Sequence, residues 1–328
     1  MKPQLKLLVI GHLLSALGLS AHAQGILTPP GAPAATMKTL GQIEPRTPIS
    51  DAPYTISEPG SYYLTTNLTV SSGTAITIAT NGVTLDLNGY TIRSTAASAT
   101  GSGVYIKNWL SDISIANGHI CGGVTNNGSG IFSGSGFGSG IYEYTDAINN
   151  PNGADYAKNV LVSRVSVSGC LSQGIFLGGA PSAVENCVAR TTGSGIIATT
   201  IKSCQAQDCG GQAIIGGQVS DSNGTSVGST GVSASTAINC NGSSSSGTGL
   251  SALTAQNCNG ISISGTGLSA TTAQNCYGTS STGTGLSANN ASFCTGYRFG
   301  GTAIQATIAT GCIAAVGTNI ITYKYNMP

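Results

Sequence analysis

Charge is scarce in this sequence: Asp, Glu, Lys and Arg make up 7% of its 328 residues, against about 25% in an ordinary globular domain. Low charge argues against a disordered polyelectrolyte. No cluster of Lys and Arg occurs, so the chain does not resemble a basic nucleic-acid-binding protein, and no nucleic-acid partner is expected. Uncharged polar residues that alternate with Val, Ile, Leu and Ala instead suit the surfaces of β-sheets.

Long apolar runs and helical periodicity are missing after the first residues. Residues 1–23 have the features of a signal peptide: a positive start, an apolar run over 7–19, and an Ala-His-Ala cleavage pattern at 21–23. That run is too short to span a bilayer, and no later stretch is long and apolar enough to do so. We therefore expect an exported protein, secreted or located in the periplasm or cell envelope, with no membrane span.

Histidine is scarce as well. Removal of residues 1–23 takes two of the three histidines and leaves His119. A catalytic or metal-binding histidine needs partners, and none is evident near His119 in the sequence beyond Cys121. We therefore expect His119 to be an outward-facing residue at a strand end.

The mature chain is close to neutral. Removal of residues 1–23 also takes Lys2 and Lys6 from the 12 basic residues, which leaves 10 basic residues against 11 acidic ones.

The chain does contain a repeat of eighteen residues, which runs through its last third. Four kinds of residue recur in step: Cys240, Cys258, Cys276, Cys294 and Cys312; Val232, Leu250, Leu268, Leu286 and Ile304; Thr230, Thr248, Thr266, Thr284 and Thr302; Ala234, Ala252, Ala270, Ala288 and Ala306. A fixed short period with apolar and small residues in phase indicates a stacked solenoid. Within a coil, Leu250 and Ala252 share the inner face of a strand, and Ser251 faces outward.

The hand of the solenoid follows from the spacing of apolar residues. A left-handed solenoid also has coils of this length but needs an apolar residue at every sixth position. Counted from Leu250, these positions hold the polar residues Gln256 and Ser262. We predict an all-β fold, a right-handed parallel β-helix over 43–328, which has the favoured hand for parallel crossovers. A Pro/Ala/Gly-rich linker is predicted over 24–42.

The cysteines are predicted to be buried free thiols. Cys170, Cys187 and Cys204 are 17 apart, Ser222 fills the next position, and the five cysteines of the repeat follow. Both runs are odd in number, so pairing of neighbours leaves one thiol over in each. Stacked strands also place like residues about 4.8 Å apart, beyond the Cβ separation of a disulfide. Cys121 and Cys209 lie outside this series, and whether they form disulfides stays open.

Two further positions of the repeat suggest how each coil bends. Asn239, Asn257 and Asn275 are predicted to form a ladder of side-chain amides that hydrogen-bond between coils. Gly260 is expected at a turn of the chain.

Several segments resemble a known family. The stretch 37–92, with "QIEPRTPIS", "PGSYYLTTNLTV" and "NGVTLDLNGYTI", resembles the opening of secreted bacterial right-handed parallel β-helix repeat proteins of the pectate-lyase-like group. The string "DISIANGHI" at 112–120 is similar to the N-x-x-I-x-N-G-x-I coil motif of that group, with Asp112 in place of the first Asn. The resemblance implies the fold for most of the mature chain.

The resemblance does not extend to the catalytic residues of that group. Polygalacturonase-like members carry Asn-Thr-Asp, Asp-Asp, Gly-His-Gly and Arg-x-Lys, and none of these strings occurs here. Clustered Asp ligands for calcium and an Arg-x-Pro-x-x-Arg segment, as in pectate lyases, are also absent. The fold therefore carries over but the chemistry does not. No catalytic residue, metal or cofactor is predicted.

The candidate ligand-binding residues come from a charged, Tyr-rich excursion over 137–158. They are Tyr142, Glu143, Tyr144, Asp146, Asp155, Tyr156 and Lys158. Carboxylates could act as acid and base or hold calcium, and tyrosines could stack on sugar rings. The alternative is a solvated loop between coils.

Three other features have competing interpretations. Trp109 with Lys107 could form a platform for a sugar, or Trp109 could plug the end of a coil. Glu185 and Lys202 are expected to be neighbours on adjacent coils and to form a surface ion pair. The threonine series lacks a Thr-x-Thr array, which argues against ice binding.

Two hypotheses on function follow. The first is a non-catalytic protein that binds polysaccharide or has a structural role in the envelope or outside the cell. The alternative is a polysaccharide lyase or glycoside hydrolase that uses the 137–158 excursion. In that case its carboxylates should converge on a groove beside Lys107, Trp109 or Arg164. The oligomeric state is left open.

Overall fold

The computed structural model describes residues 45–144 and 156–327. All regular structure in these two ranges is β-strand. Among the same residues, no helix is long and apolar enough to cross a bilayer. The predicted signal peptide, residues 1–23, and the predicted linker, residues 24–42, lie outside the described residues.

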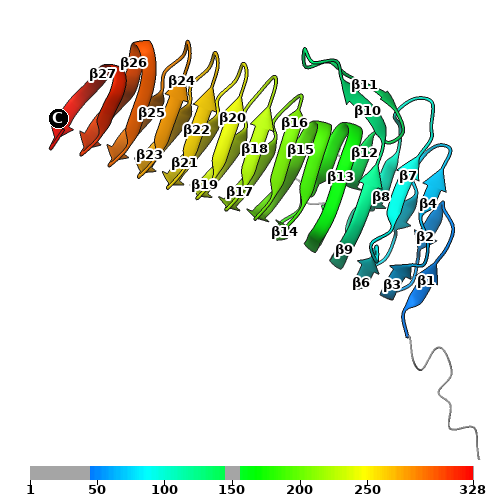
Figure 1. Ribbon diagram of the computed structural model, residues 1–328. Coiled ribbons are helices and arrows are strands. Elements are labelled where there is room, and N and C mark those ends of the chain that lie inside the picture. The colour runs from blue at the N-terminus through cyan, green and yellow to red at the C-terminus, as the bar shows by residue number, and fades with distance from the viewer. Residues whose placement is uncertain (1–44, 145–155, 328) are drawn as a thin grey trace, which may run out of the picture. The chain divides into compact units, whose positions relative to one another are not determined.

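The strands are short in the N-terminal coils and become regular toward the C-terminus (Figure 1). In chain order they are β1 (Thr47–Ile49), β2 (Tyr54–Ile56), β3 (Gly60–Leu64), β4 (Leu68–Val70), β5 (Ile76–Ile78), β6 (Val83–Asp86), β7 (Thr91–Ser94), β8 (Ser102–Ile106), β9 (Ser111–Cys121), β10 (Gly123–Asn126), β11 (Phe132–Ser135), β12 (Ser139–Glu143), β13 (Lys158–Phe176), β14 (Ser182–Glu185), β15 (Val188–Lys202), β16 (Gln205–Cys209), β17 (Ile214–Ser220), β18 (Asn223–Ser226), β19 (Val232–Ile238), β20 (Asn241–Ser244), β21 (Leu250–Gln256), β22 (Asn259–Ser262), β23 (Leu268–Gln274), β24 (Tyr277–Ser280), β25 (Leu286–Ser292), β26 (Thr295–Thr310) and β27 (Ile313–Tyr325).

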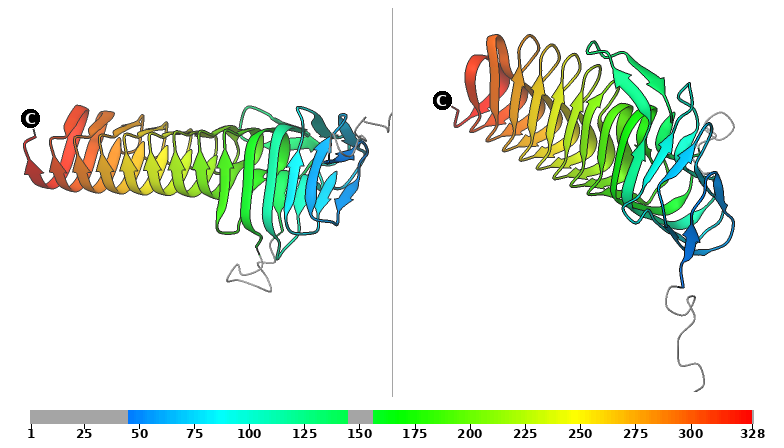
Figure 2. Two further views of the ribbon diagram at one scale, coloured as in Figure 1. Left: turned by 90° about the horizontal axis from the view of Figure 1, so that it is seen from below. Right: turned by 45° about the vertical axis from the view of Figure 1, so that its right-hand side comes forward.

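Each coil passes along three faces of the solenoid, and parallel pairing links each face to the next coil (Figure 2). Face 1 contains β3, β6, the first parts of β9 and β13, β14, and the ends of β15, β17, β19 and their successors. Face 2 contains β4, β7, the second parts of β9 and β13, the beginning of β15, and β16, β18, β20, β22 and β24. Face 3 contains β2, β5, β8, β12 and the beginnings of β17, β19 and their successors. Long strands such as β13 bend around corners and so join the faces.

The register confirms the eighteen-residue coil. Leu250 pairs with Val232 on one side and with Leu268 on the other, and Ser251 pairs with Ser233 and Ser269. The leucine side chains are fully buried, whereas the serines are partly exposed. Stacking places like residues against like, which removes the inward-facing apolar side chains of these coils from water. The chain is therefore the right-handed parallel β-helix predicted from the sequence.

The thiol series runs inside the solenoid as predicted, and all ten cysteines are free. The five of the regular repeat are at most 3% exposed. Their thiols also act as weak donors: Cys258 Sγ lies 3.1 Å from the carbonyl oxygen of Gln256. Ser222 fills the same position with the same bond, to Ser220 O at 2.7 Å. Cys209, which lay outside the series, is buried too, and Cys121 is half-buried.

The bend between faces 1 and 2 explains the asparagine ladder. Asn239, Asn257 and Asn275 have φ of 52–54°, in the left-handed region that Asn tolerates better than other residues with a Cβ. Asn257 Nδ2 donates to Asn239 Oδ1 at 3.3 Å, which confirms amide bonding between these two coils. The expectation that Gly260 lies at a turn is wrong. Gly260 is buried inside β22, where a Cβ would lie 2.3 Å from Gly267 O.

A buried serine ladder, which the sequence analysis missed, closes the corner after face 2. It consists of Ser226, Ser244, Ser262 and Ser280. Ser262 Oγ donates to Gly247 O at 2.6 Å and accepts from Gly265 N at 2.8 Å. Each hydroxyl therefore satisfies backbone groups on two coils, which would otherwise be buried without partners.

One hairpin leaves the regular stack. Strands β10 and β11 pair antiparallel and contact β13 and β15 (Figure 1). Asn126 Nδ2 donates to Asp208 Oδ1 at 2.6 Å, and Thr191 Oγ1 donates to Asp208 Oδ2 at 2.9 Å. These bonds fasten the hairpin along the corner that follows face 2.

Candidate functional site

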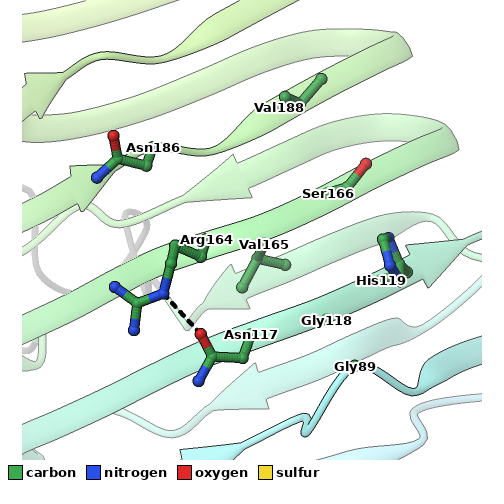
Figure 3. Close-up of a pocket in the computed structure, with 9 residues that line it drawn as sticks. All are labelled: Gly89, Asn117, Gly118, His119, Arg164, Val165, Ser166, Asn186 and Val188. Carbon is green, nitrogen blue, oxygen red and sulfur yellow. Dashed lines mark hydrogen bonds between the residues drawn. The ribbon is translucent and has the colours of Figure 1, made fainter.

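A surface groove of about 390 Å³ lies at the corner between faces 1 and 2. Its walls come from the turn after β6, from β9, from β13 and from the start of β15 (Figure 3). The lining residues are Gly89, Asn117, Gly118, His119, Arg164, Val165, Ser166, Asn186 and Val188. Most of the polar ones can donate hydrogen bonds, and none is a carboxylate.

Arg164 is the charged side chain at one end of the groove. It occupies the same kind of corner position as the asparagines of the later coils, with φ of 54°, and it is exposed. Its Nε donates to Asn117 Oδ1 at 2.7 Å (Figure 3). Among the described residues Arg164 has no other hydrogen bond or ion pair, so its terminal nitrogens are available to a ligand.

The partner amide is itself held in one orientation. Asn117 Nδ2 donates to Asp86 Oδ1 at 3.1 Å, and Arg46 Nη1 donates to Asp86 Oδ2 at 3.1 Å. The amide nitrogen of Asn117 therefore faces a carboxylate and its oxygen faces Arg164. This chain of bonds across neighbouring coils fixes the guanidinium at the edge of the groove.

Face 2 carries two outward rows of side chains, and the groove is lined by members of the first row. The first row is Thr91, His119, Ser166 and Val188, and the second is Arg93, Cys121, Ser168 and Arg190. The expectation for His119 is confirmed, since it is exposed on β9. Three of the five arginines of the chain, Arg93, Arg164 and Arg190, thus share this face and its corner.

The second row contains another oriented guanidinium. Arg190 Nη2 donates to Gln207 Oε1 at 2.7 Å, on the next coil. Asp208 follows Gln207 but accepts from Asn126 and Thr191, as described for the hairpin. Arginine side chains whose charge is not neutralised by a carboxylate attract anions.

The predicted 137–158 site is divided by the structure. Glu143 is fully buried in β12 and accepts hydrogen bonds from Ala157 N and from Gly179 N, the latter at 3.1 Å. Because it is fully buried, Glu143 does not line an open groove beside Lys107, Trp109 or Arg164, as the enzyme hypothesis requires. Lys158 is exposed at the start of β13. Asp146 and Asp155 lie outside the described residues.

The tyrosines of that segment mainly contact other parts of the protein. Tyr142 stacks between Tyr105 and Phe176 of the adjacent coils, with ring centroids 6.3 and 5.4 Å apart. Tyr144 meets Tyr105 edge-on. Burial, and to a lesser extent the neighbouring tyrosines, raises the pKa of Tyr105 and of Tyr142, so both hydroxyls stay neutral. Since its faces are used in the stack, the ring of Tyr142 is poorly placed to stack on a sugar.

The remaining candidates are also placed. Tyr156 is half-buried, and its ring covers Gly178. Trp109 lies on a turn with φ of 62° and is 64% exposed, so it does not plug a coil end. Glu185 and Lys202 are neighbours in register, but no ion pair joins them in this described part of the chain.

Comparisons with known proteins leave the family open. No family model matches the chain, and no curated protein matches it. Among solved structures, the enzymatically active domain of tailspike protein 2 of bacteriophage CBA120 matches with 12% identity and a TM-score of 0.28. The match covers 87% of this chain but 42% of that domain. A similarity this low adds nothing to the fold seen in the structure and does not bear on function.

Proposed function

We propose that this protein is an exported, non-catalytic binding protein for acidic polysaccharides. The observation that carries the proposal is the groove on faces 1 and 2, which is lined by Arg164, His119, Asn117, Asn186 and Ser166 and by no carboxylate. Guanidinium groups bind carboxylate and sulfate groups through paired hydrogen bonds. Amides, imidazole and hydroxyl groups bind the hydroxyls of sugars. Export rests on the signal-peptide pattern of residues 1–23.

The absence of acidic groups from the groove supports binding over hydrolysis. Glycoside hydrolases use two carboxyl groups about 5–10 Å apart, on either side of the scissile bond. None of the residues that line this groove can supply them. Glu143 is enclosed elsewhere, and its carboxylate accepts backbone hydrogen bonds.

The test is a glycan array with acidic and neutral polysaccharides, followed by affinity measurements with wild type and Arg164→Ala. We expect retention of uronate or sulfated glycans and a loss of about tenfold or more for the variant, the effect of removing a charged hydrogen-bond partner. Lys202→Ala is the matched control, since Lys202 is an exposed cation on face 1. Equal binding of neutral and acidic glycans, or unchanged binding by Arg164→Ala, would refute the proposal.

The same samples separate binding from the enzyme alternative. Reaction mixtures are assayed for new reducing ends and for unsaturated uronate ends over long incubation. Absence of both agrees with a binding protein. Release of either product by wild type, abolished by substitution in the groove, would replace the proposal with a lyase or hydrolase. A protein that binds no glycan at all would instead support the purely structural hypothesis.

A further inference from the structure

We propose that face 2 carries a second anion-binding subsite at Arg190, so that the site binds an acidic polymer lying along the strands from Arg164 to Arg190. This inference rests on the proposed function. It adds the direction of the bound chain, the number of charged contacts and a minimum ligand length.

The first support is the orientation of the two arginines. Arg164 is held by the amide oxygen of Asn117 and Arg190 by the amide oxygen of Gln207, each at 2.7 Å and each on a neighbouring coil. Both guanidinium groups therefore keep free N–H groups in a fixed position. A preoriented guanidinium loses little conformational freedom when it binds a carboxylate.

The second support is the separation of the two charges. Ser163 pairs with Glu185 and Ser166 with Val188, so Arg164 corresponds in register to Asn186. Arg190 lies four residues further along the strand and one coil on. At about 3.3 Å per residue and about 4.8 Å between strands, the two Cα atoms are roughly 14 Å apart. A monosaccharide with a single acidic group cannot reach both.

The third support is the direction of the groove. From Arg164 and Asn117 it extends along the strands to His119, Ser166 and Val188, as Figure 3 shows. Arg190 is two residues beyond Val188 on the same face of β15. Ser168 lies beside this path and presents a small side chain with a hydroxyl. The surface between the two arginines can therefore accommodate the sugar rings of one chain.

A different path would run along the solenoid axis, from Arg93 through Cys121 and Ser168 to Arg190. It would span three coil spacings, also roughly 14 Å. Among the described residues Arg93 has no hydrogen-bond partner that would orient it, and none of the four residues on this path lines the groove, whereas Arg164 does. The oriented pair, Arg164 and Arg190, is therefore the stronger assignment.

The experiment measures the affinity of oligogalacturonates from dimer to octamer for wild type, Arg164→Ala, Arg190→Ala and Arg93→Ala by calorimetry. For wild type we expect a rise of about tenfold once the oligomer spans both arginines. Arg190→Ala should abolish this rise and leave the short oligomers unaffected, whereas Arg164→Ala should weaken binding at all lengths. Thermal melting of each variant checks that the fold is intact.

Each outcome decides between the two proposals. If Arg190→Ala binds every length like wild type while Arg164→Ala is weakened, the second subsite is wrong and the proposed function stands. If Arg93→Ala removes the rise in affinity with oligomer length, the chain lies along the axis from Arg93 to Arg190 and this inference is overturned. If no oligogalacturonate or sulfated oligosaccharide binds wild type, the proposed function fails and the subsite fails with it.

Discussion

Arg164 Nε donates a hydrogen bond to Asn117 Oδ1 at 2.7 Å, from one coil to the previous one, although 47 residues separate them in the chain. Asn117 in turn donates to Asp86. The carboxylate of Asp86 thus affects the groove indirectly, because it orients the side-chain amide of Asn117 that accepts from Arg164. Asn117 is a positioning residue for the guanidinium.

Asn117→Gly should therefore weaken glycan binding without unfolding the protein. Glycine keeps the left-handed backbone of this position, φ 62°, but leaves Nε of Arg164 without its acceptor. Loss of one such hydrogen bond corresponds to about threefold to tenfold in affinity. Calorimetry with polygalacturonate measures it, and the salt dependence should be unchanged because every charge is retained. Unchanged affinity would contradict the positioning role.

Glu143→Ala should destabilise the protein, because the backbone N–H groups of Ala157 and Gly179 lose a buried acceptor. Each buried donor left without a partner costs about 1–3 kcal/mol. Glu143→Gln keeps one acceptor oxygen and should be intermediate. Urea unfolding followed by circular dichroism gives the free energies. An intact fold with loss of a glycan-cleaving activity would instead favour the enzyme hypothesis.

Ser262→Ala tests the buried serine ladder. The change removes the acceptor of Gly265 N and the donor to Gly247 O in a position that is 2% exposed. We expect a loss of about 2 kcal/mol in the free energy of unfolding. Ser264→Ala is the matched control in the same coil, because Ser264 is exposed and water can replace its bonds. Equal effects of the two substitutions would show that the ladder is unimportant.

The corner asparagines should be sensitive to backbone preference more than to side-chain contact. Asn257 has φ of 52°, which a β-branched residue adopts only at a cost of roughly 1–2 kcal/mol. Asn257→Gly is expected to be nearly neutral and Asn257→Val clearly destabilising in thermal melts. Gln256→Ala, at the neighbouring exposed position, serves as the control. Similar melting temperatures for the Gly and Val variants would argue against this explanation.

The thiols should make the protein sensitive to alkali. Burial raises the pKa of Cys170, with a smaller contribution from Cys121, and burial raises that of Cys209, each from 9.0 to about 12. As the pH rises, these thiols lose their protons at a lower pH in the unfolded protein than in the folded protein. The contribution of the two thiols to the free energy of unfolding is therefore complete below about pH 9 and is lost as the pH rises toward 12. The slope is about 1.4 kcal/mol per pH unit for each such thiol. Urea unfolding at pH 8 to 11 measures it.

Cys170→Ala should reduce that slope. In the native protein at neutral pH, a thiol reagent should modify Cys121 first and the buried cysteines after unfolding. Rapid modification of several thiols in the folded protein would show that the series is accessible to solvent.

The fold could be predicted from the sequence because the eighteen-residue repeat is strict. Residues such as Leu250 and Cys258 recur at a fixed interval, and parallel stacking converts equal spacing along the chain into contact in space. The serine ladder has the same spacing and could have been found in the same way. Its hydrogen bonds to backbone groups, and the left-handed φ at Asn257, required the course of the coil to be known.

The groove could not be predicted from the sequence because the coils that form it differ in length. The β10–β11 hairpin and residues 137–158 lie between Asn117 and Arg164, so no constant interval relates these two residues. Glu143 shows the opposite case, in which the sequence suggested a site that the structure does not contain. A carboxylate in a polar, Tyr-rich segment suggested a site, but the structure encloses it against the backbone of Gly179.

By itself the sequence determined the architecture of this protein: a stack of short coils with thiols, alanines and leucines inside. That information is local and periodic, and burial of apolar surface enforces it at every coil. Only the tertiary structure decided which polar side chains face the same solvent-filled space. Those neighbours come from different coils, and the bends and insertions between them set their register, which no residue pattern along the chain encodes.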